Sequence, residues 1–236
     1  MANYVDNFTD GPPDVALVSH TPDSGGTWTE VEDSAGSKSF EVNSGSMLLR
    51  LAEDNVNSQR LLYTISWTPA TNEYDVLWTY AVSPVTNDDP QWVLARYTGT
   101  ASYYAAGNYA TGGNPDQKIV KVTAGPTRTL LASGNFATTT GDIFKFQVRT
   151  AAKKLFQGVT ERLSSTDDTI TAVGSCGLAM GNLGDVSTDD LTDGQMDVFK
   201  LEDVVAGGGR IMSSLAAAGG LVSHGGIAGL GGGLAG

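Results

Sequence analysis

Residues 7–28, NFTDGPPDVALVSHTPDSGGTW, decide the fold class, because this stretch carries strong turn signals and no helical period. Its apolar residues are separated by the turn-formers Gly11-Pro12-Pro13 and Asp23-Ser24-Gly25-Gly26. Glycine and proline favour turns since each adopts backbone angles that other residues resist. The stretch therefore predicts an extended chain start, a short apolar anchor, a tight turn and a first full strand that begins at Trp28.

The segment Met196-Asp197-Val198-Phe199-Lys200-Leu201 reads as the last strand, with alternate residues pointing inward. We expect this strand to pair with the opening segment and to close a single all-β body. Between the two ends, apolar alternation predicts many short strands and no helix, which is typical of a sandwich or a barrel. A length of 236 residues suits one such domain. The expected strand regions are 40–42, 47–51, 59–67, 74–82, 92–97, 103–109, 118–122, 129–133, 142–150, 154–159 and 169–180.

Three motifs carry a family resemblance: Phe8-x-Asp10, the run from Ser19-His20 through Gly25-Gly26-x-Trp28, and the closing strand with Asp197 and Phe199. They resemble concanavalin A-like (LamG-type) jelly-roll domains, which recur in structural and adhesive proteins of tailed-phage virions. The resemblance implies an antiparallel jelly-roll β-sandwich and often glycan binding, but no reaction. We expect residues 1–205 to form the sandwich and residues 206–236 to form a Gly/Ala-rich docking tail.

Composition restricts the partners and the compartment. The net charge of −12 argues against binding to a phosphate backbone, so we expect no nucleic-acid partner. The single cysteine, Cys176, lies in an apolar segment and is expected to be a buried core thiol. The N-terminus has no basic region followed by an apolar one, which predicts no signal peptide and synthesis in the host cytoplasm.

The tail beyond residue 206 has a different chemistry. Residues 207–236 contain 12 of the 30 glycines and no acidic residue, and their last part repeats in sixes as GGLVSH, GGIAGL and GGGLAG. A flexible linker is one interpretation, while the glycines and His224 disfavour a membrane span. The other interpretation is a docking peptide that begins with a short helix over 210–218. Its aliphatic contacts would be Ile211, Leu215, Leu221, Ile227, Leu230 and Leu234.

Catalytic motifs are incomplete. The segment Glu73-Tyr74-Asp75-Val76-Leu77-Trp78 is the nearest match to the E-x-D-x-x-E strand motif of retaining β-glucanases, but Trp78 replaces the third carboxylate. We therefore expect Glu73 and Asp75 to be surface charges. Ser19, His20 and Asp23 form no triad, since neighbouring side chains on an extended segment point to opposite faces. His20 is expected to be a polar turn residue, and the protein to be no enzyme.

Four aromatic residues are candidates for contact with a glycan or a partner, because they follow a polar turn or lie among small residues. The alternative is an edge strand with ordinary exposed tyrosines. Related domains often hold calcium, and acidic clusters occur at 88–89, 167–168 and 185–193, but none has EF-hand spacing and no ligand is assigned. No other cofactor is expected. The four aromatic candidates are Trp92, Tyr103, Tyr104 and Tyr109.

These observations predict a non-enzymatic protein of the phage virion surface, either a capsid decoration (cement) protein or a head or tail fibre component. Its tail would bind other virion proteins, such as capsid or tail subunits, and the chain would self-associate as a trimer. The alternative is a lectin-like adhesin that binds host surface glycans, with calcium. A third hypothesis is a glycanase built on Glu73 and Asp75.

Overall fold

The computed structural model describes residues 3–10, 13–33, 40–43, 48–51, 60–82, 91–99, 102–108, 116–123, 128–181 and 195–204. The predicted docking tail, Tyr109 and the acidic clusters at 88–89 and 185–193 lie outside these ranges. In the part of the chain that is described, no helix has the length and apolar character needed to cross a bilayer.

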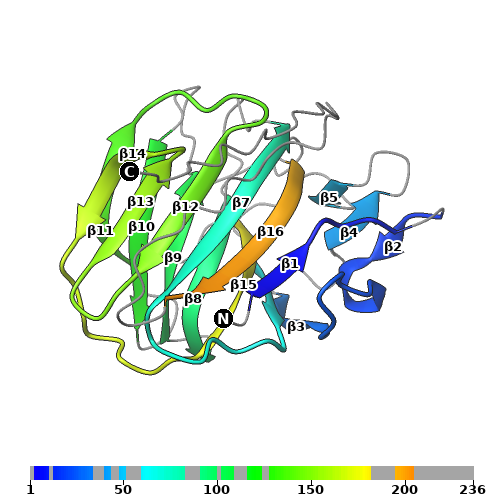
Figure 1. Cartoon of the computed structure of the whole chain (residues 1–236), viewed down its shortest axis with the longest axis horizontal. Coiled ribbons are helices and arrows are strands. Elements are labelled where there is room, and N and C mark those ends of the chain that lie inside the picture. The colour runs from blue at the N-terminus through cyan, green and yellow to red at the C-terminus, as the bar shows by residue number, and fades with distance from the viewer. Residues whose placement is uncertain are drawn as a thin grey trace, which may run out of the picture. The chain divides into compact units, whose positions relative to one another are not determined.

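Two antiparallel sheets form a β-sandwich (Figure 1), which confirms the predicted fold class. A single 3-10 turn, η1 (Leu17–Ser19), is the one helical element among the described residues. The nine-stranded sheet runs in the order β14 (Thr160–Ser165), β13 (Lys153–Gln157), β12 (Ile143–Val148), β7 (Tyr74–Val82), β16 (Gln195–Asp203), β5 (Leu48–Leu51), β4 (Phe40–Asn43) and β2 (Val15–Ala16), with β1 (Asn3–Asp6) also paired to β16. The seven-stranded sheet runs in the order β11 (Arg128–Asn135), β10 (Asp116–Thr123), β9 (Ser102–Asn108), β8 (Gln91–Gly99), β15 (Ser175–Gly181), β6 (Arg60–Ile65) and β3 (Trp28–Asp33).

The core lies between the sheets and is rich in aromatic rings. Trp28 of β3 meets Phe199 of β16 with ring centroids 5.3 Å apart, and Phe40 of β4 meets Tyr63 of β6 at the same distance. Such tilted ring pairs each contribute about 0.5–1.5 kcal/mol beyond the burial of their area. The predicted core position of Cys176 is confirmed, since its side chain is buried, and alternate residues of β7 are buried as well: Tyr74, Val76, Trp78 and Tyr80.

The opening stretch pairs with the last strand, as predicted. Tyr4 lies opposite Leu201 and Asp6 lies opposite Phe199 in an antiparallel register. On its other side, β1 is bound by the predicted turn, where the Val5 N–H donates to the Ser24 hydroxyl at 2.8 Å. Gly25 and Gly26 have φ values of 75° and 93°, a left-handed backbone that explains the pair of glycines before Trp28.

Both faces of the seven-stranded sheet carry buried apolar residues. A second cluster lies on the face opposite the core and includes Trp92, Tyr103, Val120 and Val122. All three aliphatic residues of 118–122 are therefore buried, with Ile119 on the core face and Val120 and Val122 in the second cluster. A sheet that is apolar on both faces gives near-continuous hydrophobic strands instead of a clear alternation.

The exposure expected for three aromatic rings was wrong. Trp92 is 1% exposed, and Tyr103 and Tyr104 are fully buried. Trp92 and Tyr103 belong to the second apolar cluster, whereas Tyr104 joins the main core. Their small neighbours Ala105 and Ala106 are themselves buried strand residues, so the surrounding Ala and Gly marked close packing and not an open edge.

Candidate functional site

A bulge in β8 creates the most unusual feature of the described chain. Arg96 has a positive φ of 53°, which is rare for a residue with a Cβ atom. The pairing of β8 with β15 shifts register at this place. Gly174 packs directly on the bulge with a φ of 61°, and a Cβ atom there would lie 2.5 Å from the Arg96 carbonyl carbon. Bulges re-aim side chains near functional sites, and strained residues persist where the surroundings fix them.

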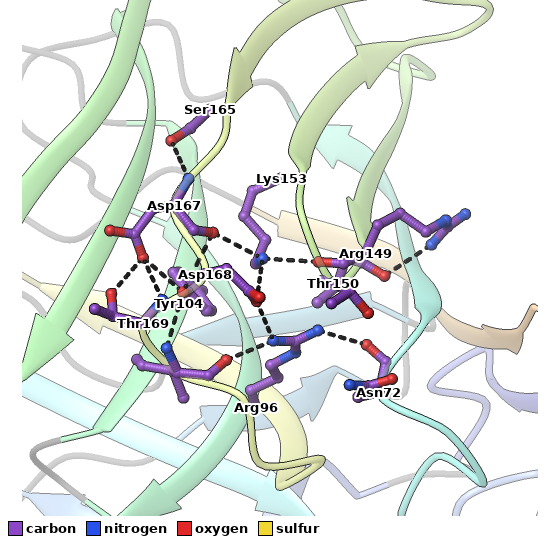
Figure 2. Close-up of polar contacts among 12 residues, drawn as sticks. Asn72, Arg96, Tyr104, Arg149, Thr150, Lys153, Ser165, Asp167, Asp168 and Thr169 are labelled. Carbon is purple, nitrogen blue, oxygen red and sulfur yellow. Dashed lines mark hydrogen bonds and ion pairs between the residues drawn. The ribbon is translucent and has the colours of Figure 1, made fainter.

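The bulge turns the Arg96 side chain into the end of the sandwich, where it is fully buried. Figure 2 shows its guanidinium between two loops. Nη2 donates to the Asn72 carbonyl at 2.7 Å, and Nη1 donates to the Ile170 carbonyl and lies 3.4 Å from Asp168 Oδ1. The Nε–H of Arg96 is buried and has no hydrogen-bond partner among the residues that the structure describes. A buried donor without an acceptor costs free energy, so the unpaired Nε–H lowers the stability of the folded protein at this site.

Lys153 of β13 is a second fully buried cation in the same network. Its Nζ donates to the carbonyls of Arg149 and Asp167 at 2.8 and 3.0 Å, and it lies 4.7 Å from the centroid of the Tyr104 ring. Asp168 Oδ1 is 3.8 Å away. Burial, together with the nearby charge of Arg96, lowers the pKa of Lys153 to about 8.

Asp167 anchors the loop that covers these cations. Its carboxylate accepts hydrogen bonds from the Tyr104 hydroxyl at 2.6 Å, from the Thr169 hydroxyl at 2.6 Å and from the Lys121 ammonium. Partial burial raises the pKa of Asp167, but these hydrogen bonds outweigh it and hold the pKa well below its usual range. The pKa of Tyr104 is raised to about 12, mainly by burial and secondly by the hydrogen bond to Asp167.

Asp168 is a partly open charged group of the network, with a side chain that is 34% exposed. Its Oδ1 lies 3.4 Å from Arg96 Nη1 and 3.8 Å from Lys153 Nζ, so both buried cations pair with this carboxylate. The Asn72 carbonyl binds the same guanidinium. A carboxylate that is fixed by buried cations and open on one side is a preorganised acceptor for hydroxyl groups.

This end of the sandwich brings together residues that the sequence analysis had separated. Tyr104, Asp167 and Asp168 lie in one network with Arg149 and Thr150 (Figure 2). Asp75 joins it through Arg149, and Glu73 through Thr150. The expectation that Asp75 is a surface charge was wrong, because Asp75 is 8% exposed and forms an ion pair with Arg149. Glu73 is partly exposed and accepts a hydrogen bond from the Thr150 hydroxyl at 3.0 Å.

His20 also departs from the expectation of a polar turn residue. It caps η1, but it is only 5% exposed and lies between the carboxylates of Asp6 and Asp10. Among the described residues, no group of three or more His, Cys, Asp and Glu side chains could hold a metal ion. At the predicted acidic cluster 167–168, the carboxylates form ion pairs with Lys121, Lys153 and Arg96.

Sequence reasoning missed Arg96 and Lys153. A usable signal was present in the segment Trp92-Val93-Leu94-Ala95-Arg96-Tyr97, since an arginine inside an apolar strand needs a buried partner. Lys153 gave no such signal, because it begins a short strand beside a second lysine, and an exposed position was the natural expectation.

No protein-family model matches the chain, and no curated protein matches it in sequence. Solved structures match its fold. The GH43 protein BlXynB from Bacillus licheniformis is 13% identical with a TM-score of 0.56, and the match covers 85% of this chain but only 39% of BlXynB. The carbohydrate-binding module CBM66 from Bacillus subtilis is 11% identical with a TM-score of 0.51, over 75% of this chain and 95% of the module.

The exoplasmic/lumenal domain of VIP36, solved with Ca²⁺ and Man3GlcNAc bound, is 11% identical with a TM-score of 0.53, over 76% of this chain and 84% of that domain. At these identities the similarity shows the fold alone. The chain has the jelly-roll β-sandwich that occurs in carbohydrate-binding and lectin-like proteins, which agrees with the predicted concanavalin A-like fold.

Proposed function

We propose that the chain is a non-catalytic glycan-binding domain and that Asp168 accepts hydrogen bonds from the hydroxyl groups of a neutral sugar. One observation carries the proposal: a partly exposed carboxylate pairs with two fully buried cations, Arg96 and Lys153. The similarity of the fold to a carbohydrate-binding module and to the VIP36 domain supports it. The ion pairs orient the Asp168 carboxylate before the ligand binds, which reduces the entropic cost of binding.

A neutral ligand fits this site better than an acidic one. The open groups at the rim are acceptors, namely Asp168 and Glu73, while the cations lie beneath them and are already bound. The chain as a whole carries a net charge of −12, which repels sulfated or uronate-rich glycans. Sugar hydroxyls donate to carboxylates without this repulsion.

The acidic residues of the network do not favour hydrolysis. A retaining glycosidase needs two carboxyl groups about 5 Å apart with one of them free to act as a nucleophile. Asp75 is buried and paired with Arg149, and Glu73 is bound to Thr150. We infer that neither carboxylate attacks a substrate, and that the enzyme hypothesis is the weaker one.

Binding to an immobilised panel of neutral, sulfated and uronate-containing oligosaccharides tests the proposal. We expect saturable binding to a neutral member and a loss of about tenfold or more in Asp168→Asn, which keeps the shape of the side chain but removes its charge. Asp116→Asn is the matched control, because Asp116 is a similarly exposed carboxylate that pairs with Lys118 on β10. Binding that prefers anionic members, or that survives Asp168→Asn, would contradict the assignment.

Calcium is tested in the same assay. The VIP36 domain was solved with Ca²⁺ bound. In this chain the Asp167 carboxylate pairs with Lys121 and the Asp168 carboxylate pairs with Lys153. We expect chelation with EDTA to leave the Asp168-dependent binding unchanged. A loss of binding that added Ca²⁺ restores would show that the ion is required.

We also propose that the domain acts on a phage virion surface, as a capsid decoration protein or a fibre component, and that its tail attaches it to capsid or tail subunits. The sequence of the tail supports this, because aliphatic residues recur at fixed spacing among glycines in residues 219–236. Deletion of residues 207–236 should abolish incorporation into the particle and reduce self-association, including the expected trimer. Unchanged incorporation of the deletion variant would refute the attachment.

A further inference from the structure

A second polar cluster lies at the start of the chain, apart from the proposed glycan site. His20 follows η1, and both nitrogens of its ring contact carboxylates: Nε2 is 2.7 Å from Asp6 Oδ1, and Nδ1 is 2.6 Å from Asp10 Oδ2. The His20 and Asp6 side chains are essentially inaccessible to solvent, while that of Asp10 is 23% exposed. Asp6 belongs to β1, so the ring joins the first strand to the segment that follows it.

Two carboxylates on one imidazole require a particular protonation state. A neutral imidazole has one N–H donor and one acceptor nitrogen, so it would present a lone pair to one of the carboxylates. The imidazolium has two N–H donors and satisfies both. Burial lowers the pKa of His20, but the hydrogen bonds and charges of Asp6 and Asp10 outweigh it and raise the pKa above the ordinary 6.5.

The Asp6 carboxylate has more hydrogen-bond donors around it than the Asp10 carboxylate. Asp6 has other donors, because Oδ2 accepts from the Trp28 indole N–H at 2.7 Å and Oδ1 accepts from the Phe8 N–H at 2.9 Å. The Tyr4 hydroxyl lies 3.4 Å from Oδ2. Asp10 is partly exposed and can turn to solvent. Phe8, between the two acids, has a positive φ of 52°, so the segment is held in a strained backbone conformation.

We propose that this cluster is a pH-operated clasp, in which the imidazolium of His20 holds Asp10, at the end of residues 7–10, against the sandwich and loss of its proton as the pH rises releases that end. β1 stays in place, because its pairing with β16 and the bonds from Trp28 and Phe8 to Asp6 remain. The clasp goes beyond glycan binding and does not depend on it.

The two strands that pack against η1, β3 and β4, have Glu30, Glu32 and Glu41 as their described ionisable side chains, and the charges that raise the pKa of His20 are those of Asp6 and Asp10. Asp23, in the turn beside β1, binds the Asn7 N–H at 2.8 Å. Acidic neighbours favour the imidazolium. A histidine whose pKa is raised by folding contributes its full stabilisation below pH 6.5, and this is lost as the pH rises through the raised value.

The test is an NMR titration of the imidazole nitrogens in His224→Gln, which leaves His20 as the only histidine of the two in the chain. We expect both nitrogens to be protonated below a midpoint that lies above 6.5. The ring signals of Phe8, whose centroid is 5.9 Å from that of His20, should follow the same titration. Asp10→Asn should lower the midpoint by about one pH unit or more, whereas Asp116→Asn should not move it.

A midpoint at or below 6.5 would overturn the proposal, and so would a midpoint that Asp10→Asn leaves unchanged. If Asp10→Asn does not fold, the Phe8 signals of the parent variant decide. Signals that remain constant while His20 titrates would show that the ring changes charge without releasing the segment.

Discussion

At the scale of single residues, the site depends on a contact that only glycine allows. Gly174 lies against the Arg96 bulge, and both residues have a left-handed backbone. The Arg96 N–H donates to the Tyr74 hydroxyl at 2.7 Å, which fixes the bulge from the core side. The strained conformation at Arg96 costs of the order of 1–3 kcal/mol, and the surrounding bonds must offset it.

Replacement of Gly174 by alanine therefore has a predictable cost. The new Cβ atom would lie 2.5 Å from the Arg96 carbonyl carbon and 2.7 Å from the Tyr97 backbone, so the bulge must shift. We expect a loss of at least about 3 kcal/mol in urea unfolding. Gly158→Ala is the matched control, since Gly158 has a φ of 58° with no atom near its Cβ position, and it should cost only about 1–2 kcal/mol. Equal losses would refute the packing role.

The buried ammonium of Lys153 predicts a pH effect of opposite sign to that of His20. Its pKa is lowered from 10.5 to about 8, so the folded protein binds fewer protons than the unfolded chain between these values. Stability therefore rises with pH in that window. We expect the free energy of unfolding of the wild type, measured relative to Lys153→Met, to increase from pH 8 to pH 10. The titration of Tyr104 stays outside this range, because its pKa is raised to about 12. A constant difference would contradict the buried charge.

Individual residues were also where sequence reasoning was weakest. His20 was expected in a polar turn, yet Asp6 and Asp10 bury it. Tyr104 was expected to be exposed, either as a contact for a glycan or partner or on an edge strand, yet it is buried and its hydroxyl binds Asp167. Both contacts join segments that the local pattern treats separately, so spacing along the chain carries no signal of them.

At the scale of elements, the first strand, β1, is held by side-chain contacts as well as by its backbone pairing with β16. The Trp28 indole donates to buried Asp6, and its ring packs on Phe199, so β1, β3 and β16 meet at one place. Elements with large apolar residues at alternate positions were predictable, and β7 has the predicted bounds of Tyr74–Val82. β14 was missed, because Leu163 is the only apolar residue in Thr160–Ser165.

Trp28→Phe tests this fastening. Phenylalanine keeps much of the ring packing but removes the donor to Asp6, which leaves a buried carboxylate with one hydrogen bond fewer. Loss of a hydrogen bond to a charged group costs about 1.5–3 kcal/mol, and thermal unfolding should report it. Trp67→Phe is the control, since Trp67 is partly buried with its ring 6.3 Å from that of Tyr4, and it should cost less. A larger loss at Trp67 would argue against the role of Asp6.

At the scale of the whole molecule, the amino-acid pattern predicted the all-β class and the pairing of the first and last strands, because both follow from turn residues and alternation. The second apolar cluster of the seven-stranded sheet was not predicted. Trp92 and Tyr103 pack there with small residues, and small residues around tyrosines suggested an exposed edge strand. The glycan site escaped prediction for a related reason. Its cations come from β8 and β13, which lie in different sheets and meet only in the fold.

The most direct test of the account is a calorimetric titration of the wild type, Asp168→Asn and Asp116→Asn with the neutral oligosaccharide that binds best in the panel. Arg96 and Lys153 pair with Asp168 and orient it, so we predict saturable binding of the oligosaccharide by the wild type and by Asp116→Asn. Asp168→Asn should bind about tenfold more weakly or less, because a charged acceptor is lost. Equal affinity of all three proteins, or no binding of neutral sugars by the wild type, would contradict it.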